Sequence, residues 1–220
     1  MAPGEYYHIY NRGTGKQHLF HDKADWHRFL FGILYLQSPE TFRNLMRVAG
    51  RYTPDVGFPV STDDTEAILK HRFVELVAFC IMPNHFHLIV KETKEGGIAN
   101  YMHRVQQGYA KYFGNKHGTN GHVFQGTYKA VHVEENKQLL YLSAYIHRNP
   151  HELSDWKGRE FEYPWSSLQD FTSGNRWGGL IVPDVIVEQF EQTKDSNYAD
   201  FVKSSTAKLL KEELADLNLP

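Results

Sequence analysis

Two histidines separated by a single residue form the strongest chemical pattern in the sequence. His85 and His87 flank Phe86 in the run MPNHFHLIV. Because successive side chains of a strand point to opposite faces, both imidazoles would lie on the same side of a sheet. Neutral imidazole nitrogens bind divalent cations, so the pair indicates a metal site. The alternative is an ordinary pair of surface or hydrogen-bonded histidines, because the chain contains 13 histidines in all.

A second chemical group lies in the run YLSAYIHRNP, residues 141–150. Residues four apart share one face of a helix, so Tyr145 and Asn149 would project together, with Tyr141 one turn earlier. If this face lies over the two histidines, Asn149 can offer a neutral oxygen to the metal. The Tyr145 hydroxyl would then meet a phosphate bound to the same ion. The alternative is that both tyrosines are core aromatics.

The elements that must position these groups can be predicted from hydrophobic periodicity and from turn residues. The pattern is β-α-β-β-α-β followed by a helix, which is typical of the ferredoxin-like split βαβ plan. We therefore expect an α+β fold, in which an antiparallel sheet carries helices on one face. The expected strands are 5–11, 72–82, 85–92 and 123–133, and the expected helices are 22–36, 97–114 and 134–147.

The remaining segments are expected to be an insertion and an extension. Residues 38–71 contain several prolines and glycines, so we interpret them as an insertion or loop with short helical pieces. Segments 184–192 and 198–216 have helical patterns. We therefore divide the chain into a domain at 1–172 and a C-terminal helical extension at 173–220.

The two chemical motifs together resemble a known family. PNHFHLIV followed by YIHRNP is similar to the single-tyrosine HUH transposases, and most similar to their REP-associated (IS200-like) branch. The segments YYHIYNRG, GHVFQGTYKA and YPWSS also resemble that family, so the resemblance spans about residues 5–172. It implies metal-dependent cleavage and rejoining of single-stranded, hairpin-associated DNA through a 5′-phosphotyrosine.

The resemblance also implies roles for individual residues. His85 and His87 would be metal ligands for Mg²⁺ or Mn²⁺, Asn149 the third ligand and Tyr145 the nucleophile. The spacing of Tyr145 to Asn149-Pro150 fits the family, which favours Tyr145 over Tyr141. One position departs from the pattern, since Thr127 stands where we expect arginine after Gln-Gly. Members of the family act as monomers or as homodimers, and both states remain open.

Charge is distributed unevenly along the chain. The formal net charge is only −2, but residues 96–133 contain no Asp or Glu, whereas residues 151–220 are acidic. A polyanion would therefore meet a local positive face. His132, in the strand before the tyrosine helix, is either a further metal ligand or a surface or DNA-facing residue. The candidate DNA contacts are Arg12, Lys111, Lys116, Gln125, Lys129 and Arg148.

Two other functions compete with strand transfer. One is a catalytically retired protein that binds DNA hairpins without cutting them, which the departure at Thr127 favours. The other is a metal hydrolase acting on a small phosphoester, which would need no tyrosine nucleophile. The chain has no signal-peptide pattern, no apolar run of 18 residues and a single cysteine, Cys80, so we expect a cytoplasmic protein without a membrane span.

Overall fold

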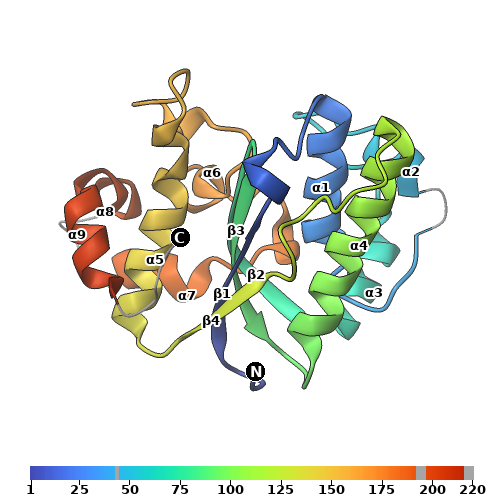
Figure 1. Ribbon diagram of the computed structural model, residues 1–220. Helices are drawn as coiled ribbons and strands as arrows, with labels where there is room; N and C mark the ends of the chain where they lie inside the picture. Colours follow the sequence, from blue (N-terminus) through green and yellow to red (C-terminus); the bar gives the residue numbers. More distant parts are fainter. Residues whose placement is uncertain (43–44, 192–196, 216–220) are drawn as a thin grey trace.

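A four-stranded antiparallel sheet forms the centre of the structure (Figure 1). The computed structural model describes residues 1–42, 45–191 and 197–215. The strand order β2-β3-β1-β4, with β1 paired antiparallel to both β3 and β4, is that of the predicted split βαβ plan. The predicted α+β class is therefore confirmed. The strands are β1 (Tyr6–Arg12), β2 (Val74–Met82), β3 (His85–Glu92) and β4 (Lys129–Val133).

Two long helices, α1 (Lys23–Tyr35) and α4 (Gly97–His117), cover one face of this sheet (Figure 1). The Asp22 side chain caps α1 by accepting a hydrogen bond from the Asp25 N–H at 3.1 Å. Phe29 of α1 packs against Phe86 of β3 and against Tyr109 of α4, and all three are buried. The apolar faces of both helices therefore lie against the strand that carries the His-Phe-His motif, on the side of Phe86.

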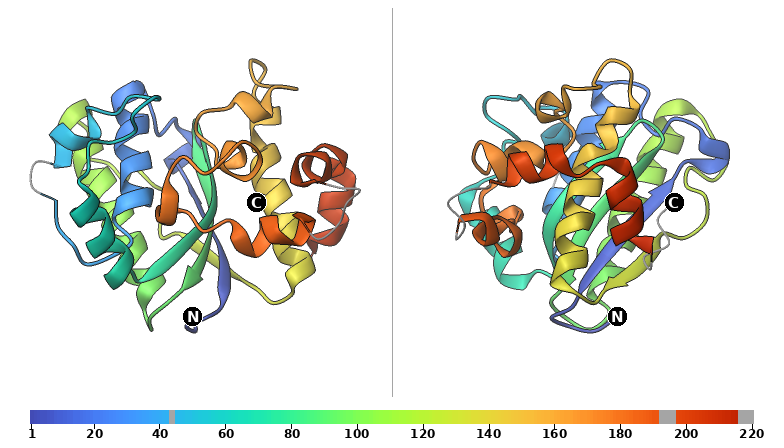
Figure 2. Two further views of the ribbon diagram at one scale, coloured as in Figure 1. Left: turned by 180° about the vertical axis from the view of Figure 1, so that it is seen from behind. Right: turned by 90° about the vertical axis from the view of Figure 1, so that its left-hand side faces the viewer.

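The opposite face is covered by α5 (Asn136–Arg148) and by the C-terminal helices (Figures 1 and 2). The two helices of the split βαβ plan, α1 and α4, lie on one face as expected, and α5 adds a cover on the other. The reason is that β2 and β3 are apolar on both faces: Cys80 and Ile89 are as completely buried as Phe79 and Leu88. A sheet with two apolar faces needs a cover on each.

The expected insertion contains two helices, α2 (Leu45–Ala49) and α3 (Thr62–His71). The Ser61 hydroxyl accepts from the Asp64 N–H and so starts α3. Phe58 and Ile68 are buried in the core on the α1 side. The insertion thus packs on the helices α1 and α4 rather than on the face that carries the histidines.

The C-terminal part contains α6 (Leu168–Thr172), α7 (Asp184–Glu191), α8 (Tyr198–Ser204) and α9 (Ala207–Glu213). The helix expected at 198–216 is divided at Ser205 into α8 and α9. Residue 216 of this expected helix, and residue 192 of the helix expected at 184–192, lie outside the described residues. A domain boundary at 172 stays a prediction. None of the helices described is long and apolar enough to span a membrane. The short 3-10 helices are η1 (Thr14–Lys16), η2 (Asn149–Glu152), η3 (Glu160–Glu162) and η4 (Gly178–Leu180).

Candidate active site

Strands β1 and β3 bring a row of polar side chains to the sheet face under α5. His85 pairs with Arg12 across the two strands, and His87 pairs with Tyr10. Paired residues of neighbouring antiparallel strands point to the same face, so these four side chains lie together. The rings of His85 and His87 are 5.1 Å apart between centroids and nearly perpendicular, at 86°. The two imidazoles therefore share one side of the sheet, as their spacing predicted.

Helix α5 places the tyrosine and the asparagine directly over these histidines. His85 Nε2 lies 3.3 Å from Asn149 Oδ1. The Asn149 Nδ2 group donates to the backbone oxygen of Tyr145 at 2.9 Å, which turns the amide oxygen towards the histidine. The Tyr145 ring meets the His87 ring edge-on, with centroids 5.5 Å apart. The geometric condition set by the sequence, that the helix face and the strand face meet, is therefore fulfilled.

These groups line a common cavity of about 230 Å³. Three further residues of its wall were missed in the sequence: Lys16, Asn84 and Glu152. Asn84 Oδ1 lies 2.7 Å from His85 Nδ1, where it can accept the ring N–H and so orient that ring. Glu152 lies three residues after Asn149 in η2, the 3-10 helix that directly follows α5. Its helical spacing from Tyr145 is the sequence signal that indicates a place for it in the site. The cavity wall consists of Arg12, Lys16, Asn84, His85, His87, Tyr145, Asn149 and Glu152.

Burial determines the charge state of the site. It lowers the pKa of His85, and it lowers the pKa of His87 well below the usual value, because a charged imidazole is poorly solvated there. Both rings are therefore neutral at pH 7 and can offer a lone pair to a cation. Burial also raises the pKa of Tyr145 to about 12, and the Glu152 carboxylate adds to this rise. The phenol needs a nearby positive charge before it can act as a nucleophile.

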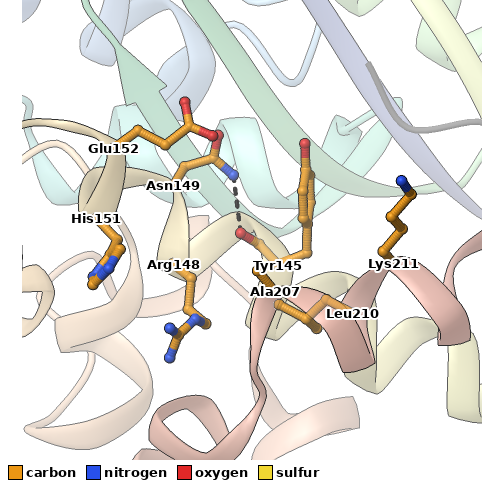
Figure 3. A pocket seen from close by; sticks show the side chains of 8 residues that line it. All are labelled: Tyr145, Arg148, Asn149, His151, Glu152, Ala207, Leu210 and Lys211. Atoms are coloured by element: carbon orange, nitrogen blue, oxygen red, sulfur yellow. Dashed lines mark hydrogen bonds between the residues drawn. The ribbon is translucent and has the colours of Figure 1, made fainter.

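A second cavity, of about 340 Å³, lies on the other side of Tyr145 (Figure 3). Figure 3 shows the Tyr145 ring between Asn149 and Glu152 on one side and Lys211 of α9 on the other. Leu210 of the same helix lines this cavity as well. The C-terminal extension thus reaches the candidate nucleophile, which the sequence did not predict.

Three of the predicted DNA contacts lie near the site. Arg12 is part of the cavity wall. Lys129 pairs with Tyr10 across β1 and β4, and therefore points to the same face as the histidines. Gln125 donates its backbone N–H to the Arg12 oxygen at 2.8 Å and leaves its side chain exposed. Their roles in binding DNA stay predictions, but their placement beside the cavity agrees with them.

Of the other three predicted DNA contacts, Lys111 and Lys116 lie on α4, and Arg148 lines the second cavity beside Tyr145. Lys111 is exposed on α4, on the opposite side of the sheet. The Lys116 ammonium is engaged by Asp22 and Asp25, at 2.6 and 2.7 Å. Arg148 donates to the backbone oxygens of residues 202 and 203, at 3.0 and 3.2 Å, and so holds the end of α8. For Lys116 and Arg148 the structure shows internal partners that the sequence did not reveal.

The structure also places the residues for which the sequence left alternative roles open. His132 pairs with Tyr7, on the face opposite His87, and lies 3.0 Å from a Glu5 oxygen. Tyr141 packs its ring against Phe201 of α8, with centroids 5.3 Å apart. Neither arrangement directs the side chain towards the two histidines. Thr127 lines a separate open groove between α4 and residues 121–128.

A different cluster of potential metal ligands lies at the ends of α1 and α4. His21, Asp25 and His117 place their ligand atoms within 4.8 Å of one another. The Lys116 ammonium lies 2.7 Å from the Asp25 oxygen in the same cluster. A cation is thus already supplied by the protein, and a metal ion would have to displace it. We therefore regard this cluster as an ion-pair network that joins the two helices.

Comparisons with known proteins point to one class. Residues 64–149, which contain both motifs, match the family described as "Transposase IS200 like". The fold is similar to that of a solved structure, "Structure of the REP associates tyrosine transposase bound to a REP hairpin", with a TM-score of 0.51 and 14% sequence identity. The similarity covers 83% of this chain and 86% of that one. The predicted resemblance to IS200-like transposases is therefore confirmed over residues 64–149, and the similarity to the REP-associated transposase is confirmed for the fold. Curated proteins gave no match.

Proposed function

We propose that this protein is a DNA strand transferase, which cuts single-stranded DNA beside a hairpin and rejoins it through a 5′-phosphotyrosine on Tyr145. The single observation that carries the proposal is the convergence of this tyrosine with three potential metal ligands in one cavity. The Tyr145 ring contacts His87, and Asn149 Oδ1 lies 3.3 Å from His85 Nε2. Three elements that are distant in sequence, β1, β3 and α5, meet there.

The donor set fits a divalent cation. His85 and His87 are neutral because burial lowers the pKa of both rings, and Asn149 adds a neutral amide oxygen. Two imidazole nitrogens and oxygen ligands suit Mn²⁺, and Mg²⁺ accepts the oxygen ligands and leaves positions for phosphate. When bound, the ion would neutralise the non-bridging oxygens of the cleaved phosphate and favour the phenolate form of the tyrosine. We therefore expect a requirement for Mg²⁺ or Mn²⁺.

The chain's own residues account for the covalent step. The Tyr145 oxygen attacks phosphorus and forms a new O–P bond, while the bond from phosphorus to the 3′ oxygen breaks. The phenol proton passes to the Glu152 carboxylate in the cavity wall, and the departing 3′ oxygen takes up a proton from solvent water. A second 3′-hydroxyl can then attack the phosphotyrosine and release the phenol. Because one ester replaces another, rejoining needs no external energy source.

Hairpin DNA is the substrate class that we propose for this site. The solved relative is described as bound to a REP hairpin. In this chain, Arg12 in the cavity wall and Lys129 on the same sheet face offer positive charges to a DNA backbone that enters the site. We propose that the single strand next to a hairpin crosses this face and brings its phosphate to Tyr145.

The test is the formation of a covalent adduct. A labelled hairpin oligonucleotide with single-stranded flanks is incubated with the protein and Mn²⁺, and products are separated under denaturing conditions. We expect a labelled protein band that needs Mn²⁺ and that Tyr145→Phe abolishes. Tyr141→Phe is the matched control and should retain the adduct, because its ring packs on Phe201.

The competing functions predict other outcomes. A retired hairpin-binding protein would shift the oligonucleotide in a native gel but give no adduct with any divalent metal. A hydrolase of small phosphoesters would turn over without an adduct and would be unaffected by Tyr145→Phe. An adduct that persists in Tyr145→Phe and disappears in Tyr141→Phe would transfer the nucleophile role to Tyr141.

A further inference from the structure

His8 is a completely buried histidine that touches the candidate metal ligand His87. Its side chain is 0% exposed, and its Nε2 atom lies 2.9 Å from His87 Nδ1. The two rings stack, with centroids 5.1 Å apart and an interplanar angle of 17°. The other ring nitrogen of His8, Nδ1, is buried and has no hydrogen-bond partner in the part of the chain that the structure describes.

Such a residue calls for an explanation, because an apolar side chain would fill the same space at lower cost. Burying a nitrogen without a partner is unfavourable, and native proteins rarely do so without a reason. Among the described residues, the one hydrogen bond of the His8 side chain is that to His87. The bond holds because β1 and β3 are in register: His8 pairs with Ile89 and Tyr10 with His87, so both histidines point to the α5 face.

The bond limits which nitrogen of His87 can bind a metal ion. A neutral imidazole carries one N–H and one lone pair, so one of the two rings must donate in this bond. If His87 Nδ1 donates to His8 Nε2, the other nitrogen of His87 keeps its lone pair for the cavity. If His8 donates instead, the proton of His87 lies on Nε2 and blocks a metal there. Metal binding at His87 therefore requires His8 to act as the acceptor.

We propose that His8 is a positioning residue, which accepts a hydrogen bond from His87 Nδ1 and so directs the Nε2 lone pair of His87 towards the metal. The proposal rests on the proposed function, since it concerns the same metal site. His8 itself touches neither metal nor DNA. It occupies the place that a carboxylate or a backbone carbonyl takes behind many metal-binding histidines. A neutral imidazole in that place fixes the ring without adding a negative charge to the site.

The test measures Mn²⁺ affinity by calorimetry in the DNA-free protein, and compares two amides at one position. In His8→Gln the amide oxygen can reach His87 Nδ1, and in His8→Asn the side chain is one methylene shorter and cannot. We expect His8→Asn to weaken Mn²⁺ binding about 10- to 100-fold, as the loss of such an outer partner typically does. His8→Gln should retain most of the affinity.

Two controls separate positioning from stability. Ile89→Val alters packing beside His8 on the neighbouring strand but leaves the hydrogen bond intact, so Mn²⁺ affinity should be unchanged. Thermal unfolding of all variants shows that each is folded at the temperature of the titration. Because His8→Gln and His8→Asn bury similar amides, a general loss of stability would affect both alike.

The outcomes are distinct. Equal Mn²⁺ affinities for His8→Asn and His8→Gln, whether both like the wild type or both weakened, would overturn the proposal. If instead the wild type binds Mn²⁺ no better than a His85→Ala protein, the metal site of the proposed function fails, and the role of His8 with it. The first pattern leaves the proposed function intact, so the two failures can be told apart.

Discussion

Replacement of Lys116 by methionine tests whether this lysine serves the fold or the DNA. Its ammonium lies 2.7 Å from Asp25 Oδ1 and 2.6 Å from Asp22 Oδ1. The Asp25 side chain is 0% exposed, so its charge depends on the donors around it. Without the lysine, Asp25 keeps three partners: the His21 backbone N–H at 2.8 Å, the Tyr112 hydroxyl at 2.8 Å and His117 Nε2 at 3.0 Å. Lys116→Met therefore leaves a buried carboxylate that is only partly compensated.

The expected cost in stability follows from that geometry. Removing one partner of a fully buried ion pair costs about 3–5 kcal/mol. Lys116 is itself 28% exposed, so solvent already weakens the pair. Together with the donors that remain on Asp25, this reduces the expected loss of unfolding free energy to about 2 kcal/mol at pH 7.

The same reasoning predicts how the loss depends on pH. Burial alone would raise the pKa of Asp25, but the hydrogen bonds from Lys116, from the His21 N–H and from Tyr112 outweigh it and hold the pKa below its usual value. An aspartate with a lowered pKa stabilises the fold above the pKa of the unfolded state, about 3.9, and this stabilisation is lost as the pH falls through the folded-state pKa. The difference between wild type and Lys116→Met should therefore shrink in acid.

Urea unfolding at pH 7 measures the effect, with Lys111→Met as the matched control. Lys111 is exposed on the same helix, so its replacement should change stability little. The double variant Asp25→Asn with Lys116→Met should lose less than the sum of the two single changes, because both act on one pair. In gel-shift assays Lys116→Met should leave hairpin binding unchanged, because its ammonium is held by Asp22 and Asp25. If Lys116→Met retains wild-type stability and loses hairpin affinity instead, the structural role of this lysine is refuted.

Three further predictions concern the site. Glu152→Gln should slow adduct formation about 10²-fold or more without weakening hairpin binding, because it removes the proton acceptor; equal rates in a single-turnover adduct assay would exclude that role. His85→Ala should abolish Mn²⁺ binding in calorimetry and the metal-dependent adduct, yet retain hairpin binding in EDTA. Thr127→Arg should strengthen hairpin binding and steepen its salt dependence by about one unit of slope, as one new phosphate contact does; an unchanged slope would show that this groove does not face the DNA backbone.

The elements of the fold were predictable where a hydrophobic pattern continued over many residues and where a local capping residue marked the start of the element. β3 has the predicted bounds, and Asp22 caps α1 as predicted. The strand expected at 123–133 is shorter, since β4 begins only at Lys129. Helix α3 lies in the segment for which only short helical pieces were expected, although Ser61 followed by Asp64 is a local N-cap signal for it. The prolines and glycines upstream of it favour a loop in that segment.

The site was predictable because its parts follow simple periods. His85 and His87 share a face by strand alternation, and Tyr145 and Asn149 share one by helical spacing. Their meeting depended on which face of the sheet α5 covers, and the split βαβ plan does not specify that. The sequence does not indicate Glu152, because Asn149-Pro150 is typical of a helix end. In the structure a 3-10 helix follows α5 at this point and brings Glu152 to the cavity.

What the sequence concealed were partners far along the chain. Lys116 looked like a DNA contact because its neighbours carry no acids, yet its carboxylate partners lie 94 and 91 residues away. Arg148 holds backbone oxygens 54 and 55 residues away in α8. His8 was part of an aromatic strand, and its bond to His87, 79 residues away, appears only when the register of β1 and β3 is known. Long-range pairing, not local pattern, decides such roles.

Mass spectrometry of the adduct can identify the residue that becomes linked to DNA, which we propose is Tyr145. The protein is incubated with a hairpin oligonucleotide and Mn²⁺, the DNA is trimmed with a nuclease, and the protein is digested with trypsin. The account predicts a nucleotide 5′-phosphate on Tyr145, in the peptide between Lys137 and Arg148. A nucleotide linked to another residue, or no linked peptide while DNA cleavage proceeds, would contradict it.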